Sequence, residues 1–267
     1  MIIACHTWAY DNLSLRDAVG TIARLGFRAI DIGSGPHLNL GEIAKDPEEH
    51  GERIRKMVND FNMDITDLYL VMTHVNSPDP NTRNMRLRMY DRMLSFAEAL
   101  ETPGITISPG IIHNDGLEHS FARAIPCLQY MADLTERRGL RISFESHLDS
   151  VAPDPESALR MLRAVPNIRL TLDIAHWIAQ GSGWREIKQM LPHAAHIQIR
   201  QAQKGKLQTP FAKGKLDIPR LLEELEALDY QGILSIEYMN AVGWHGMMPV
   251  DTAKEILCMR DAIRQAR

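Results

Sequence analysis

The stretch RISFESH, residues 141–147, ends an apolar run with an acidic residue and a histidine. Strand alternation places Ile142 and Phe144 on one face and Glu145 and His147 on the other. A carboxylate that is buried without compensation is very costly. A strand that ends in this way therefore indicates a functional site as well as a core strand.

Three later strand-like segments repeat this pattern of one polar face and one apolar face. They read RLTLD at residues 169–173, HIQIR at residues 196–200 and LSIEY at residues 234–238. Alternation puts Asp173, then Gln198 with Arg200, and then Glu237 on the face opposite the apolar side chains. Three carboxylates and an amide thus come near the ends of consecutive strands, and a bound metal is the simplest explanation.

Short apolar runs alternate with amphipathic segments along the whole chain. Predicted strands cover residues 2–8, 29–32, 65–72, 105–108, 141–145, 168–173, 195–201 and 233–238. Predicted helices cover residues 14–25, 47–61, 82–100, 117–138 with a break near Pro126, 155–165, 184–191, 218–228 and 250–265. Strands that alternate with helices predict a parallel sheet. Eight such units predict a single (β/α)8 TIM barrel over residues 1–267.

A doubly wound open sheet is the competing architecture. It usually has fewer strands and a glycine-rich first turn, whereas AYDNLS follows the first predicted strand here. In a parallel barrel, active sites form where the strands end and the following loops begin. The four polar positions would therefore surround one point.

Composition excludes several classes of protein. A formal charge of −4 gives no general attraction for nucleic acid or an anionic membrane. Cys5, Cys127 and Cys258 are widely spaced, which argues against a disulfide framework and a cysteine zinc site. No apolar run approaches the ~20 residues that span a bilayer, and the first residues lack a basic leader segment. We therefore expect a cytoplasmic protein.

The order of these segments resembles the xylose isomerase-like TIM-barrel superfamily of sugar isomerases and epimerases. The resemblance covers essentially the whole chain and rests on SFESH at 143–147, LDIAH at 172–176, HIQIR at 196–200 and SIEY at 235–238. It implies that Glu145, Asp173 and Glu237 hold a divalent ion. It also implies that His176, three residues after Asp173, contacts oxygen atoms of a carbohydrate substrate.

One position departs from the family pattern. Where the family has a histidine ligand on the seventh strand, this chain has Gln198, and His196 lies ~6–7 Å deeper on the same face. The carbonyl oxygen of a glutamine can bind a hard cation. We therefore expect the ligands to be Glu145, Asp173, Gln198 and Glu237. An all-oxygen set favours Mn²⁺ or Mg²⁺, with Zn²⁺ as a further option.

Four more residues are candidates for substrate binding. Arg200 has inward parity, and its guanidinium suits a carboxylate or a phosphate. His147 would either contact the substrate or orient a ligand. His6 has inward parity on the first strand, and His113 follows the fourth. An interior histidine such as His6 is often hydrogen-bonded within the core, and a rim histidine such as His113 is often only solvated. A substrate-binding role and a purely structural role therefore both stay open for these two residues.

The expected chemistry begins with an α-hydroxy ketone whose oxygens bind the ion. Glu145 and Glu237 would act as general base and acid, with their order unassigned, in epimerisation or aldose–ketose isomerisation through an enediolate. The same enediolate permits loss of CO₂ or water, so a lyase acting on an oxidised sugar or keto sugar acid is the alternative. The acidic charge disfavours a DNA-repair endonuclease, and mutual repulsion of the carboxylates disfavours a metal-free sugar-binding protein. A homo-oligomer stays open.

Overall fold

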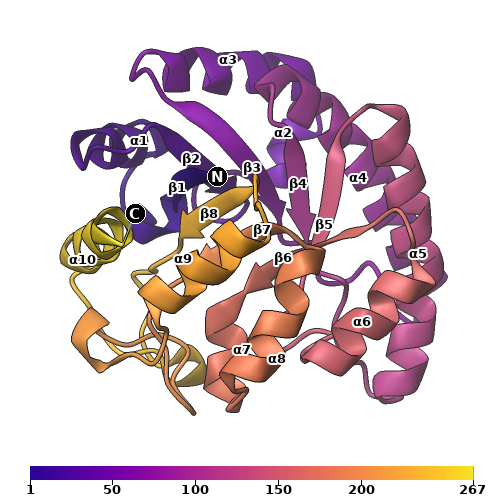
Figure 1. Ribbon diagram of the computed structural model, residues 1–267. Helices are drawn as coiled ribbons and strands as arrows, with labels where there is room; N and C mark the ends of the chain where they lie inside the picture. The colour runs from indigo at the N-terminus through magenta and orange to yellow at the C-terminus, as the bar shows by residue number, and fades with distance from the viewer. Residues whose placement is uncertain (267) are drawn as a thin grey trace.

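The computed structural model describes residues 1–266 and contains a closed barrel of eight parallel strands (Figure 1). The strands pair in sequence order, and β1 closes the barrel by pairing with β8. Their bounds are β1 Ile2–His6, β2 Ala29–Gly33, β3 Asp64–Leu70, β4 Gly104–Ile107, β5 Arg141–Glu145, β6 Arg169–Asp173, β7 Ala194–Ile199 and β8 Ile233–Ile236. The predicted (β/α)8 TIM barrel is confirmed.

Helices surround this barrel and cover its outer face (Figure 1). The α-helices are α1 Leu15–Arg24, α2 Leu40–Ile43, α3 Pro47–Asn59, α4 Pro80–Leu100, α5 Leu117–Arg137, α6 Pro155–Ala164, α7 Ile174–Gln180, α8 Trp184–Met190, α9 Ile218–Ala227 and α10 Thr252–Gln265. The 3-10 helices are η1 Thr7–Tyr10, η2 Leu191–His193, η3 Phe211–Lys213 and η4 Trp244–Gly246. No helix within residues 1–266 is both long and apolar enough to cross a bilayer.

The two faces of the strands have opposite chemistry. Outward side chains such as Ile105 and Leu170 are fully buried and belong to the apolar core beneath the helices. The inside of the barrel is polar: Thr106 and Thr171 share a hydrogen bond of 2.8 Å between their hydroxyls. A charged side chain inside the barrel needs a partner, because burying an unpaired charge is costly. The predicted site residues lie at the mouth of the barrel.

The predicted break in helix α5 at Pro126 is wrong, because the helix runs unbroken from Leu117 to Arg137. A proline lacks the amide that would donate to the carbonyl of Ala122. Both Pro126 and Ala122 lie on the exposed side of the helix, where water can satisfy that carbonyl. The missing hydrogen bond is consequently tolerated.

Helix α7 was absent from the predicted elements. It begins directly after Asp173, whose side chain caps it by accepting the amide N–H of Ala175 at 2.8 Å. All residues from Ile174 to Ala179 are buried, so the segment lacks the polar face that marks an amphipathic helix. The predicted first strand also ends early, at His6, and continues as η1.

Candidate active site

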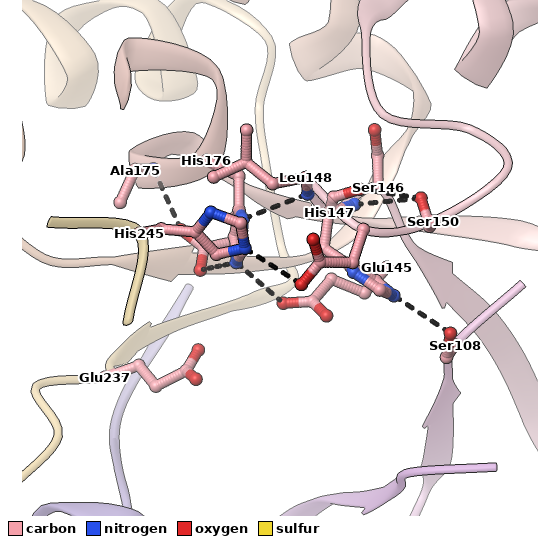
Figure 2. A network of polar contacts seen from close by, with 12 residues as sticks. Ser108, Glu145, Ser146, His147, Leu148, Ser150, Ala175, His176, Glu237 and His245 are labelled. Carbon is pink, nitrogen blue, oxygen red and sulfur yellow. Dashed lines mark hydrogen bonds and ion pairs between the residues drawn. The ribbon is translucent and has the colours of Figure 1, made fainter. Parts of the chain in front are cut away.

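A cavity of about 310 Å³ opens at the carboxyl ends of the strands. Glu145, His176, Arg200 and Glu237 all contribute to its wall. This is the end of a parallel barrel where active sites form. Figure 2 shows the carboxylate of Glu237 pointing toward the space beside Glu145 and His176.

Three of the polar residues form a compact buried group. Glu145, Asp173 and His176 each offer one potential ligand atom, and these atoms lie within 4.8 Å of one another. Nε2 of His176 is 3.9 Å from Oε1 of Glu145 (Figure 2). The same atom is 3.5 Å from Oδ2 of Asp173. The sequence predicts that Glu145, Asp173, Gln198 and Glu237 surround one point, and the compact group contains two of these four together with His176.

The hydrogen bonds of His176 define its chemical role. Its Nδ1 accepts the backbone N–H of Leu148 at 3.2 Å, so a neutral ring carries its proton on Nε2. Burial, followed by the nearby charge of Arg200, lowers the pKa of His176 well below its usual value and keeps the ring neutral. Nε2 then carries the proton of the ring and faces the carboxylates, and Nη2 of Arg200 lies 3.4 Å from it. His176 is thus suited to donate to a substrate oxygen.

Arg200 lies within the carboxylate group with 1% of its side chain exposed. Its Nη2 donates to Oδ2 of Asp173 at 2.8 Å. Its Nη1 donates to the backbone carbonyl of Glu237 at 2.9 Å and lies 3.3 Å from Oε1 of the same residue. The sequence assigned Arg200 to an anion on the substrate, and its observed partners are two carboxylates of the protein.

Burial raises the pKa of all three carboxylates. The pKa of Glu145 rises to about 8 through burial first and the charge of Asp173 second. Burial raises the pKa of Glu237 well above its usual value, although Arg200 opposes the shift, and it raises that of Asp173 in the same way. If all three carboxylates were ionised beside the one guanidinium, two negative charges would be left uncompensated, and the raised pKa values reflect that cost.

The side chains present fit one divalent cation. Such an ion would balance the two remaining negative charges. Oε1 of Gln198 and Oε2 of Glu237 are buried, and neither has a hydrogen-bond partner within residues 1–266. Buried oxygen atoms of this kind are acceptors that a cation can satisfy. Glu145 and Asp173 are the two carboxylates of the compact group. Glu237 lies outside that group, and its Oε2 and Oε1 of Gln198 are the unpartnered acceptors that could join them around an ion.

The remaining predicted residues lie at different depths. His147 lines the cavity, its Nε2 lies 2.9 Å from Oγ of Ser108, and burial lowers its pKa to about 4. Nδ1 of His6 accepts the amide N–H of Trp8 at 3.1 Å, which starts η1. His113 contacts Asn76 on the neighbouring loop at 3.2 Å. Neither His6 nor His113 is part of the cavity wall.

Sequence reasoning missed Tyr69, which donates a hydrogen bond from its hydroxyl to Oε2 of Glu145. Tyr69 comes near the end of β3 and lines the cavity. Its alternation with Asp67, which also faces inward, was the available signal. An aromatic residue in a strand is usually core, so this signal was weak.

The chain belongs to the xylose isomerase-like TIM barrel family, whose family model matches residues 19–262. It is 26% identical over 251 residues to a putative hydroxypyruvate isomerase of Danio rerio, which covers 87% of each chain. It is 27% identical to a 2-oxo-tetronate isomerase of Pectobacterium atrosepticum over 57% of this chain and 60% of that protein.

Solved structures share the fold at lower identity. The D-allulose 3-epimerase of Methylomonas sp. superposes with a TM-score of 0.79 at 18% identity, over 100% of this chain and 98% of that one. A D-psicose 3-epimerase from Clostridium cellulolyticum gives 0.80 at 14% identity, over 100% and 99%. The comparisons confirm the predicted family and the prediction of an enzyme of the sugar isomerase/epimerase kind.

Proposed function

We propose that this chain is a divalent-metal-dependent isomerase of a small 2-keto acid that carries a hydroxyl on C3. One observation carries the proposal: Glu145 and Glu237 share a cavity with the buried cation Arg200. The names of the relatives support the substrate class, since hydroxypyruvate and 2-oxo-tetronate are both 2-keto acids with a 3-hydroxyl.

Arg200 supports an acidic substrate. Among the described residues that line the cavity, it is the only one with a permanent positive charge. Its Nε has no hydrogen-bond partner within residues 1–266, so the guanidinium keeps a free donor. A planar guanidinium binds carboxylates well in a site shielded from water. The substrate carboxylate would therefore lie against Arg200.

The two glutamates would move the protons. One takes the proton from C3 of the substrate, and the electrons of that C–H bond form the C2–C3 double bond of an enediolate. Return of a proton to C2, with transfer of the hydroxyl proton from O3 to O2, moves the carbonyl from C2 to C3. His176 donates through Nε2 to a substrate oxygen and so stabilises the charge that develops there.

Glu145, Asp173, Gln198 and Glu237 would hold the cation. When bound, a divalent ion polarises a carbonyl and stabilises the negative charge of an enediolate. Four oxygen ligands favour Mn²⁺ or Mg²⁺. The residues of the protein would supply binding, orientation and proton transfer around it.

The test is turnover of hydroxypyruvate and 2-oxo-tetronate in deuterated water, with Mn²⁺ or Mg²⁺ and after chelation. We expect a product that has the same molecular formula as the substrate, apart from deuterium at C2. The protein should show no turnover after a chelator has removed the metal. Release of CO₂ or water would instead establish the lyase alternative. Failure to turn over either acid with added metal would contradict the proposal.

A further inference from the structure

Tyr69 contacts one of the two glutamates and has no assigned role. Its side chain lies inside the mouth of the barrel with 5% relative exposure. Its hydroxyl donates to Oε2 of Glu145, and the ring is part of the cavity wall. The contact spans strands β3 and β5, which lie on either side of β4.

An aromatic neighbour holds Tyr69 in place. The ring of Trp8 packs against it with centroids 5.1 Å apart. Trp8 in turn lies directly over Gly33, where an added Cβ would come within 2.5 Å of the indole. Because residue 33 is a glycine, Trp8 can pack there and hold Tyr69. The contacts of Gly33, Trp8 and Tyr69 form a brace that runs from β2 to Glu145.

The brace gives the two oxygens of Glu145 different surroundings. Oε2 accepts the hydroxyl of Tyr69, whereas Oε1 faces Nε2 of His176 at 3.9 Å, beside Asp173. A free carboxylate can bind a cation through one oxygen or through both. The hydrogen bond of Tyr69 orients the carboxylate so that Oε1 faces His176 and Asp173, and it leaves one lone pair of Oε2 free. In Glu237 the charged partner is Arg200, whose Nη1 lies 3.3 Å from Oε1, and Oε2 has no hydrogen-bond partner within residues 1–266.

We propose that Tyr69 is a positioning residue that keeps Oε2 of Glu145 off the cation and reserves it for proton transfer. This inference rests on the proposed function. Glu145 would then hold the ion through Oε1 and act as the base toward C3 through Oε2. Glu237 would return the proton to C2.

The test compares Tyr69→Phe, which removes only the hydroxyl, with Tyr90→Phe. Tyr90 is a matched control because it is equally buried and its hydroxyl contacts Thr135 in the helical layer at 2.6 Å. We expect Tyr69→Phe to lower kcat about 100-fold with KM within about threefold, because misplacing a reacting group by ~1 Å has an effect of this size. Tyr90→Phe should leave both constants unchanged.

Binding of Mn²⁺ to the protein without substrate gives a second readout, by calorimetry and by the spectrum of the bound ion. Tyr69→Phe should bind Mn²⁺ more tightly than the wild type, because Oε2 becomes free to join the coordination. Gly33→Ala, which displaces the indole and leaves the hydroxyl intact, should also lower kcat. Weaker or unchanged Mn²⁺ binding by Tyr69→Phe, or an unchanged kcat, would overturn the inference.

Different results would contradict the proposed function and the proposed role of Tyr69. If the wild type converts neither keto acid, the proposed function fails, and the Mn²⁺ measurement still decides the role of Tyr69. If the wild type is active and Tyr69→Phe behaves like Tyr90→Phe, the inference about Tyr69 fails alone.

Discussion

The side chain of Asp173 makes several contacts at the mouth of the barrel. Its Oδ1 caps α7 and its Oδ2 accepts from Arg200, while His176 lies one helical turn further along. The helix that Asp173 starts thus also fixes the histidine beside it. Replacing Asp173 would disturb the start of α7, the ion pair with Arg200 and the site at the same time. Substitution of Glu145 or Glu237 is therefore easier to interpret.

The two glutamates can be separated by isosteric substitution. Glu145→Gln should abolish exchange of the C3 proton with solvent, whereas Glu237→Gln should keep this exchange and lose isomerisation. Each variant should lower kcat by about 10²–10⁴-fold, the contribution of a positioned acid or base. Glu223→Gln, on the exposed side of α9, is the control and should keep full activity. Equal exchange by both variants would contradict the assignment.

A second buried pair lies deeper inside the barrel. Nε2 of His196 is 2.9 Å from Oδ2 of Asp31, and both side chains are buried. Burial alone would raise the pKa of Asp31, but attraction to His196 lowers it to about 2. Burial alone would lower the pKa of His196, but Asp31 raises it above 6.5. The pair therefore stabilises the fold within a defined range of pH.

Asp31→Asn should lower the free energy of unfolding by about 3 kcal/mol, because it leaves a buried partner uncompensated. The contribution of Asp31 is present above its unfolded pKa near 3.8 and is lost as the pH falls toward 2. That of His196 is present below 6.5 and is lost as the pH rises through its raised value. Chemical denaturation should thus show the largest difference between pH 4 and 6.5.

An exposed pair provides the control for this experiment. Arg16 and Asp60 are 3.0 Å apart, with about half of each side chain exposed. Asp60→Asn should change the free energy of unfolding by less than about 1 kcal/mol, because water screens such pairs. A similar loss for the two variants would contradict the role given to burial.

At the scale of elements, loops rather than strands determine how the site is enclosed. Asn76 joins the loop after β3 to the loop after β4. Its Nδ2 donates to the carbonyls of Ile111 at 2.7 Å and Ser120 at 3.1 Å. Its Oδ1 accepts the amide of Ile111 and contacts Nε2 of His113, both at 3.2 Å. One buried side chain therefore fixes the rim near these strands.

Asn76→Ala should lower the free energy of unfolding by about 3 kcal/mol, because it leaves several buried backbone groups without partners. Asn84→Ala, at an exposed position of α4, is the control and should change stability little. Denaturant titration measures both. A loss of stability equal to the control would show that water replaces Asn76.

At the scale of the whole molecule, the net charge of the site couples folding to a ligand. Three buried carboxylates beside one guanidinium destabilise the barrel through repulsion and burial. A cation that binds only the folded chain removes this cost. The stability of the whole barrel should consequently depend on divalent metal.

Mn²⁺ at about 100 times its dissociation constant should raise the free energy of unfolding by about 2.7 kcal/mol. The double variant Glu145→Gln and Glu237→Gln should lose this gain. Glu223→Gln with Glu226→Gln, two exposed positions of α9, should retain it. Thermal unfolding with and without Mn²⁺ measures the effect, and the absence of any shift in the wild type would argue against the metal.

The sequence by itself determined the barrel and the order of its polar strand ends. Period-two alternation and regular strand–helix spacing are local properties, and they predicted all eight strands and the positions of Glu145, Asp173 and Glu237 near the ends of their strands. It missed the α-helices α2 and α7, which at four and seven residues are too short to show a helical period. Helix α7 is buried from Ile174 to Ala179 and so has no solvent-facing polar side there, and the proline in α5 faces water.

Only the tertiary structure decided how the polar side chains pair. Tyr69 and Glu145 are 76 residues apart, and Arg200 is 27 residues from Asp173 and 37 from Glu237. No local pattern encodes contacts between strands that meet through closure of the barrel. Buried groups choose partners by distance and direction in three dimensions, because each donor and acceptor removed from water must find its partner there.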